Sequence, residues 1–181
     1  MFTHHGLTMF DVEEVPTHGG SLRIFARHTE NQAIAVTDRV AGMKKKETDF
    51  GLTKMETYTA FGEKVRATKR KLLKFLIEAK DAGKTVVAYG AAAKGVTLVN
   101  YCGVRDDLVD YVVDKSPYKQ NHFMPGVRIP IYGPEKIYET KPDYVLILPW
   151  NLKKEISEQM AGIREWGGKF VVPIPEVQVL P

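Results

Sequence analysis

The sequence predicts an α/β protein with a Rossmann-like, mostly parallel sheet and flanking helices, preceded by a β-hairpin and a long amphipathic helix. From Lys84 onward, short apolar runs alternate with helical segments, which favours a parallel sheet covered on both faces. Between residues 56 and 83, apolar side chains recur three, four or seven positions apart, as on one face of a helix. Near the start, two extended runs flank the turn sequence PTHGG.

The first segment, residues 1–30, is interpreted as a terminal β-hairpin. The runs MFDVEEV and SLRIFAR flank PTHGG, where a proline and two glycines mark a sharp reversal. Such a hairpin is not a stable domain by itself. Gly6 in HHGL is interpreted as the cap of a helix whose body is expected to lie outside this sequence. Apolar residues alternate broadly in both runs, so we expect each strand to bury one face. They are Phe10, Val12, Val15, Leu22, Ile24 and Ala26.

The second segment, residues 31–83, is predicted to be a charged, mostly helical connector. A break is expected around TDFGLT, Thr48 to Thr53, and the long helix should end at Gly83. Six apolar residues form the stripe of that helix. They are Tyr58, Phe61, Val65, Leu72, Leu76 and Ala79.

The third segment, residues 84–181, is predicted to be the Rossmann-like domain. Its expected strands are residues 85–91, 108–114, 127–133, 143–150 and 169–175. Its expected helices are residues 92–103, 134–140 and 152–168. In FMPGVRIPI, Pro125 and Gly126 indicate a turn that leads into an edge strand.

Composition limits the classes of function. The 181 residues are 44% hydrophobic and 27% charged, as in an ordinary globular protein, with a net charge of +4. Much of the positive charge lies in MKKKE, Met43 to Glu47, and on the polar side of the 56–83 helix, which favours a solvated face over a nucleic-acid patch. Nothing reaches the roughly 18 consecutive apolar residues of a membrane span, and no secretory leader is expected. We therefore expect no nucleic-acid or membrane partner, and a cytoplasmic location.

The single cysteine and the scattered histidines argue against a metal site. Cys102 allows no internal disulfide or cysteine-rich metal site and is interpreted as a small core residue, which suits a reducing compartment. Outside the hairpin turn, the histidines lack metal-ligand spacing beyond one adjacent pair, so they are interpreted as surface or loop residues. They are His4, His5, His28 and His122.

The stretch AYGAAAKGVTL is the strongest binding motif. Gly90 ends the first strand of the domain and Gly95 follows five residues later, so backbone N–H groups at a helix start could approach a phosphate, with Ala91 and Lys94 between them. Asp114 ends the next strand, where doubly wound folds place an acid against a ribose hydroxyl. The spacing matches neither the full dinucleotide fingerprint nor a P-loop. In the alternative interpretation, the small residues only permit tight helix–strand packing and Asp114 caps a turn.

Further candidates lie at the same edge, because ligands of open α/β sheets bind beyond the carboxyl ends of the strands. Lys115 and Lys119 follow Asp114, and Trp150 and Asn151 follow the strand DYVLILP. Ordinary loop or packing roles remain an alternative for each. The predicted substrate-binding set combines these positions with the glycine motif. It consists of Gly90, Ala91, Lys94, Gly95, Asp114, Lys119 and Asn151.

Several motifs in this order resemble one family. GLTMFDVEEVPTHGGSLRIFAR, YGAAAKG, VVDKSPYKQ, MPGVRIPI and LPWN together resemble the C-terminal part of the S-adenosylmethionine-dependent sugar C-methyltransferases, which methylate a carbon of a nucleotide-linked keto sugar. The resemblance runs from about Gly6 to Pro175. It implies that the hairpin closes the sheet of the methyltransferase domain and that the Rossmann-like domain helps to hold the nucleotide-diphosphate sugar.

The resemblance also implies that His18 is the catalytic base. Carbon methylation beside a ketone needs removal of the α-proton to give an enolate, which attacks the methyl sulfonium, and an imidazole of pKa about 6.5 suits that task. Gly19 and Gly20 would let substrate approach closely. An ordinary turn histidine is the alternative. Where the family places polar partners before this histidine, the chain has Val15, Pro16 and Thr17.

The family's zinc-binding cysteine segment and glycine-rich methyl-donor loop have no counterpart in this sequence. S-adenosylmethionine is therefore expected as a cofactor of the complete enzyme, bound by a missing or separate domain. We expect no cofactor on this chain, and no activity from it alone. Two other hypotheses stay open: a non-catalytic Rossmann-like module that binds a nucleotide or coenzyme, and, less favoured, a fragment of an NAD-dependent oxidoreductase. The latter is weakened because no second glycine follows two residues after Gly90.

Overall fold

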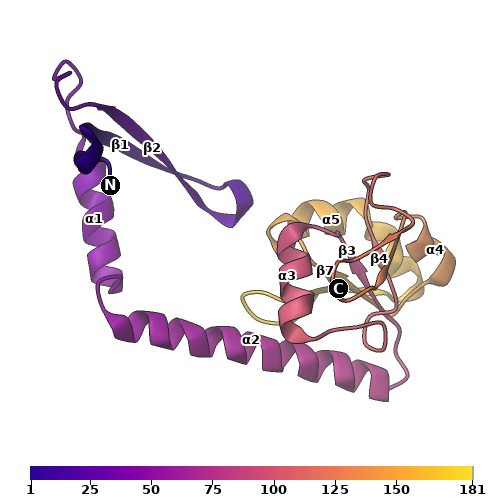
Figure 1. Ribbon diagram of the computed structural model, residues 1–181. Coiled ribbons are helices and arrows are strands. Elements are labelled where there is room, and N and C mark those ends of the chain that lie inside the picture. Colours follow the sequence, from indigo (N-terminus) through magenta and orange to yellow (C-terminus); the bar gives the residue numbers. More distant parts are fainter. Residues whose placement is uncertain (181) are drawn as a thin grey trace. The chain divides into compact units, whose positions relative to one another are not determined.

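The computed structural model describes residues 1–180 and confirms the predicted α/β class (Figure 1). The chain forms two compact units, one of residues Met1–Gly62 and one that begins at Glu63. Helix α2, Met55–Asp81, crosses this division. The three segments 1–30, 31–83 and 84–181 stay a proposal from sequence, whereas the contacts within the structure divide the chain inside this helix.

The first unit begins with the predicted hairpin. Strands β1, Leu7–Val15, and β2, Ser21–His28, pair antiparallel from Val15 opposite Ser21 to Leu7 opposite His28, with a bulge between Met9 and Asp11. A short 3₁₀ turn, η1, Thr3–His5, precedes them and ends at the left-handed Gly6, and another, η2, Thr17–Gly19, joins the strands.

The expected burial of one face on each strand is wrong for β2. Leu22 and Ile24 are 45% and 44% exposed, whereas Val12 on β1 is buried at 4%. The difference arises because helix α1, Asp38–Phe50, packs on β1. Alternation along a strand shows which side chains share a face, but burial also needs an element that covers that face.

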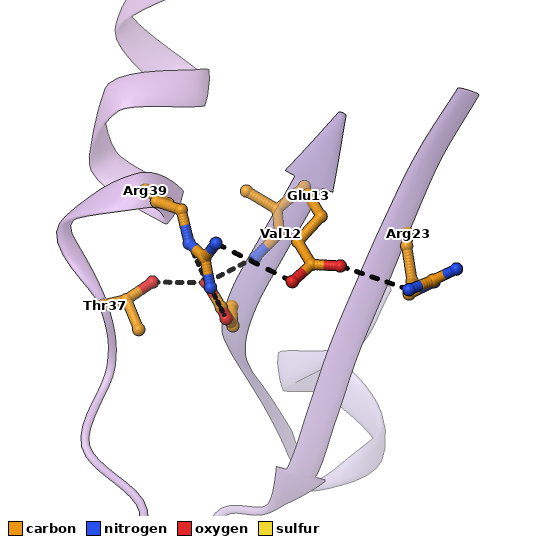
Figure 2. A network of polar contacts seen from close by, with 6 residues as sticks. Val12, Glu13, Arg23, Thr37 and Arg39 are labelled. Carbon is orange, nitrogen blue, oxygen red and sulfur yellow. Dashed lines mark hydrogen bonds and ion pairs between the residues drawn. The ribbon is translucent and has the colours of Figure 1, made fainter. Parts of the chain in front are cut away.

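A polar network joins α1 to β1 around the buried carboxylate of Asp11 (Figure 2). Thr37 Oγ1 donates to Asp11 Oδ1 at 2.6 Å, Arg39 Nε donates to the same oxygen at 2.9 Å, and Arg39 Nη2 donates to Oδ2. Glu13 extends the network, because it pairs with Arg39 at 3.7 Å and with Arg23 of β2 at 3.3 Å. The hydrogen bonds from Arg39 and then from Thr37 lower the pKa of Asp11. The start of α1 is thus fixed to the hairpin.

The predicted break between two helices is confirmed. Helix α1 ends at Phe50, and Gly51 takes the left-handed conformation at φ +89°, where its N–H bonds the carbonyls of Glu47 and Thr48. Helix α2 then runs to Asp81. Its apolar stripe is buried only in the second half, at Leu72, Leu76 and Ala79. No described helix is both long enough and apolar enough to cross a bilayer.

The second unit is built on a seven-stranded sheet of order β5-β6-β4-β3-β7-β8-β9. The five central strands are parallel, and β5 and β9 are antiparallel edges. The strands are β3 Val86–Tyr89, β4 Val112–Val113, β5 His122–Phe123, β6 Pro130–Tyr132, β7 Tyr144–Ile147, β8 Lys169–Val172 and β9 Gln178–Leu180. The helical elements are α3 Ala93–Cys102, α4 Lys136–Thr140, η3 Trp150–Leu152, α5 Lys153–Gln159 and η4 Ala161–Trp166.

Each face of this sheet has its own hydrophobic core. On one face Val86 and Ala88 of β3 pack with buried residues of α2 and α3, among them Leu76. On the other face Val87 and Tyr89 pack with residues of α4, α5 and η4. Because successive strand residues point to opposite faces, this arrangement is that of a sheet covered on both sides. Cys102 is 3% exposed in the first core, which confirms its interpretation as a core residue, and burial raises its pKa.

Two element predictions need correction, and strand β5, like β9, was not predicted. Strand β6 is not an edge strand, because the two-residue strand β5 pairs outside it. The helix expected over residues 152–168 is divided at Met160 into α5 and the 3₁₀ segment η4.

Candidate functional site

The turn between β3 and α3 is closely packed. Gly90 has φ +92°, and a Cβ there would lie 2.5 Å from Pro149 Cγ. A Cβ on Gly95 would lie 2.7 Å from Leu148 Cβ. Both glycines therefore let the turn and the first helical turn lie against the end of β7. The packing interpretation accounts for the glycines themselves.

Asp114 links the ends of two neighbouring strands. Its Oδ2 accepts the N–H of Ala91 at 2.8 Å and the Nζ of Lys119 at 3.0 Å, and its Oδ1 accepts the N–H of Ser116 at 2.9 Å. The residue is 9% exposed. The bond to Ser116 is the turn cap of the alternative interpretation. An ionised carboxylate offers about four acceptor positions, so Oδ1 retains capacity for another donor.

Lys94 and Asn151 form a second group at the same edge of the sheet. Lys94 Nζ donates to Asn151 Oδ1 at 2.7 Å, and the ammonium lies 5.1 Å from the centre of the Trp150 ring. The structure thus brings Lys94 to Asn151 and Lys119 to Asp114 and Ala91. The predicted set is divided between these two groups and the two glycines, which pack against Pro149 and Leu148.

An open pocket of about 590 Å³ lies beside α3. This volume is within the range of small-molecule sites. Ala91 and Lys119, from the predicted set, line it. The other lining residues are Ala93, Val96, Thr97, Tyr118, His122, Phe123, Pro125 and Ile131. The part of the pocket lined by Ala91 and Lys119 therefore follows the carboxyl ends of β3 and β4, where ligands of open α/β sheets bind, and the rest extends along α3 and β5.

Sequence reasoning missed the pocket residues Tyr118, His122 and Phe123. His122 was interpreted as a surface or loop residue, and it is exposed, but it lines the pocket and its Nδ1 lies 2.9 Å from the carbonyl oxygen of Gln120. The available signal was position, because SPYKQNHF directly follows Asp114 at the binding edge of the sheet.

His18 belongs to the first unit. It lies in η2 at φ +56°, a left-handed conformation in which histidine is enriched among non-glycine residues, and it is exposed. An open pocket of about 630 Å³ adjoins this turn and is lined by its neighbours Pro16, Gly20 and Leu22 among others. Among residues 1–180 no three His, Cys, Asp or Glu side chains are grouped so that they could hold a metal ion.

Comparison with known proteins gives a family match and similar proteins. A family model described as the C-methyltransferase C-terminal domain matches residues 16–175. The C-methyltransferase NovU of Streptomyces niveus is 38% identical over 183 residues, which cover 99% of this chain and 43% of that protein. The chain thus spans less than half the length of this relative. Among solved structures, UDP-D-quinovosamine 4-dehydrogenase from Vibrio fischeri matches 54% of this chain and 93% of its own, with a TM-score of 0.40 and 22% identity.

Proposed function

The chain belongs to the family of C-methyltransferase C-terminal domains, and from this premise we propose that it is the C-terminal portion of an S-adenosylmethionine-dependent enzyme that methylates a carbon of a nucleotide-linked keto sugar. Its second unit holds the nucleotide diphosphate of this acceptor, and its first unit supplies the base. The observation that carries the proposal is the pocket beside α3. Two of its lining residues, Ala91 and Lys119, both donate hydrogen bonds to the carboxylate of Asp114.

Charge supports an anionic ligand in this pocket. The Lys119 ammonium has three donor hydrogens, one of which bonds Asp114, so it can also donate to a phosphate. The start of α3 lies beside it, since Ala91 and Ala93 both line the pocket. The free acceptor capacity of Asp114 Oδ1 suits a sugar hydroxyl. Lys119 lines the pocket and is proposed to bind a phosphate, whereas Asp114, which is bonded to the lining residues Ala91 and Lys119, is proposed to accept a sugar hydroxyl beside it.

Lys94 and Asn151 are proposed to bind the same acceptor from the second group. Lys94 places a second ammonium at this end of the strands, where it donates to Asn151 Oδ1, and a second cation there suits a second phosphate. Gly90 and Gly95 contribute indirectly, because they let α3 begin close to the ends of β3 and β7.

His18 is proposed as the catalytic base. Its neutral imidazole would accept the proton from the carbon beside the ketone, and the electron pair of that C–H bond would form the enolate that accepts the methyl group. The exposed position of His18 at the hairpin tip is compatible with access to a substrate.

We propose that this chain does not bind the methyl donor. In the glycine-containing turn between β3 and α3, Pro149 packs against Gly90 and Leu148 packs against Gly95. This close packing supports the proposal. We therefore assign donor binding to a further domain, on the same polypeptide or on another, and the cytoplasm is the compartment proposed for the enzyme.

A non-catalytic nucleotide-binding module is the second candidate. One observation favours it: every residue that lines the pocket beside α3 belongs to the second unit, so binding there does not require His18. Methylation by a reconstituted enzyme that contains this chain distinguishes the two candidates.

Calorimetry on the full chain tests the proposal. We expect binding of a dTDP- or UDP-sugar and no binding of S-adenosylmethionine. Lys119→Ala should weaken sugar-nucleotide binding by about 1.5–3 kcal/mol, roughly 10- to 100-fold in Kd, because a charged phosphate contact is lost. Lys169→Ala is the matched control, since Lys169 is the first residue of β8 and lies at the amino ends of the parallel strands, away from the pocket. Binding of NAD but of no sugar nucleotide would instead favour an oxidoreductase fragment. An absence of detectable binding for every nucleotide would overturn the proposal.

A further inference from the structure

The pocket beside α3 contains aromatic side chains for which an anion alone gives no reason. Tyr118 is 90% exposed and Phe123 is 64% exposed, although both line the pocket. The other walls include apolar groups, among them Val96, Pro125 and the 4%-exposed Ile131. A pocket with apolar walls, two exposed aromatic rings and one lysine suits a ligand that is partly flat and apolar and partly anionic.

The pocket has two different ends along α3. At the first turn of the helix, Ala91 and Lys119 are tied together through Asp114. Two turns later, Asn100 Nδ2 donates to the carbonyl of Pro125 at 2.9 Å and ties the far end of the pocket to the helix. Each turn of α-helix rises about 5.4 Å. The cationic end and the end near Pro125 are therefore separated by a length comparable to that between a phosphate and a base in a nucleotide.

The backbone of Phe123, two residues before Pro125, is fixed by strand pairing. It forms β5 with His122, and the two pair with Pro130 and Ile131 of β6. The strand is short, but Asn121 N–H also bonds the carbonyl of Ile131 at 2.8 Å. The backbone of Phe123 is thus fixed while its ring stays exposed, so a ligand that stacks on this ring would not first have to order the strand.

We propose that Phe123 and Tyr118 bind the nucleobase of the nucleotide by stacking, with its phosphates directed to Lys119 and the start of α3. This inference deepens the proposed function and rests on it. Aromatic rings bind bases through their faces, and a stacked base contributes enough to change affinity several-fold to a hundredfold. A sugar ring or an aliphatic chain lacks the flat aromatic face that these two side chains match.

The test compares UDP with inorganic pyrophosphate, both titrated into the full chain. Tyr118→Ala and Phe123→Ala should each weaken UDP binding about 5- to 100-fold and leave pyrophosphate binding unchanged. Phe123→Tyr should retain most of the affinity because it keeps an aromatic face. Tyr101→Ala is the control: Tyr101 is a half-exposed aromatic residue of α3 whose ring lies near Lys69, and it does not line the pocket.

Proton NMR of the ligand gives a direct signature. Stacking on Phe123 should shift the uracil H5 and H6 resonances of bound UDP upfield, and Phe123→Leu should abolish the shift. Circular dichroism of each variant checks that it is folded. Unchanged UDP affinity in both aromatic variants would overturn the stacking inference while the phosphate site at Lys119 stands. Failure of UDP and pyrophosphate alike to bind the wild-type chain would overturn both.

Discussion

The Asp114 carboxylate, which follows β4, accepts the backbone N–H of Ala91, which follows β3, at 2.8 Å. Asp114→Ala should lower the free energy of unfolding by about 1–3 kcal/mol, because the buried N–H of Ala91 loses its partner. Asp114→Asn keeps an oxygen acceptor and should cost less stability, yet it removes the charge that positions Lys119. Urea denaturation of both variants measures the difference. Equal stability of Asp114→Ala and the wild type would show that the bond to Ala91 is dispensable.

Two glycines in helices give opposite expectations. Gly95→Ala should destabilise the second unit by about 1–3 kcal/mol, because its Cβ would lie 2.7 Å from Leu148 Cβ and the helix would have to move. Gly62→Ala is the matched substitution, since a Cβ on Gly62 in α2 meets nothing within 4 Å. It should be neutral or stabilise the chain by up to about 1 kcal/mol. Thermal unfolding compares the two, and a neutral Gly95→Ala would contradict the packing described for this turn.

Acid should weaken the attachment of α1 to the hairpin. Hydrogen bonds from Arg39 and Thr37 lower the pKa of Asp11 below its ordinary value of 3.8, so the unfolded chain binds this proton more readily than the folded chain. The ionised Asp11 therefore makes its full contribution to the free energy of unfolding at pH values above 3.8, the ordinary pKa. That contribution is lost as the pH falls through the lower pKa of Asp11 in the folded chain. Stability of the first unit should be flat near neutral pH and fall in acid. Asp11→Asn should flatten the acid limb in a series of urea titrations from pH 7 to 2, and an unaltered limb would contradict the role of Asp11.

His18→Asn separates catalysis from binding. Asparagine tolerates the left-handed conformation seen at φ +56°, so the turn should persist. In an enzyme reconstituted with a domain that binds the methyl donor, loss of a general base should reduce kcat about 100- to 10,000-fold. Calorimetric affinity of the chain for UDP should be unchanged, because the pocket beside α3 belongs to the second unit. His28→Asn provides the control, and a wild-type methylation rate in His18→Asn would remove His18 from the mechanism.

The parts of the fold that could be predicted are those with local signals. The alternation after Lys84 predicted the parallel sheet, and Gly51 in TDFGLT marked the break between α1 and α2. Strands β5 and β9 were missed because strands of two or three residues have no measurable alternation and exist only through pairing with β6 and β8. The exposure of Leu22 could not be predicted either, since it depends on where α1 packs.

For the candidate site, the location of the residues at the strand ends could be predicted from the sequence, but their hydrogen-bond partners could not. Asp114 lies at the end of β4, as its place in VVDKS indicated, and Lys119 follows it. That Asp114 would bond Ala91, and that Lys94 would reach Asn151 across 57 positions of sequence, depends on the order of strands in the sheet. The aromatic residues Tyr118 and Phe123 carried no periodic signal, because their loop folds against α3 only in the assembled sheet.

Leu72 and Leu76 of α2 pack in the hydrophobic core on one face of the seven-stranded sheet. The residues that form the Rossmann-like unit therefore begin well before its first strand. A gene that started at Lys84 would remove the α2 part of the cover over one face of the sheet, and the apolar surface exposed there would favour aggregation. To express the second unit alone, the shortened chain should begin at or before Glu63.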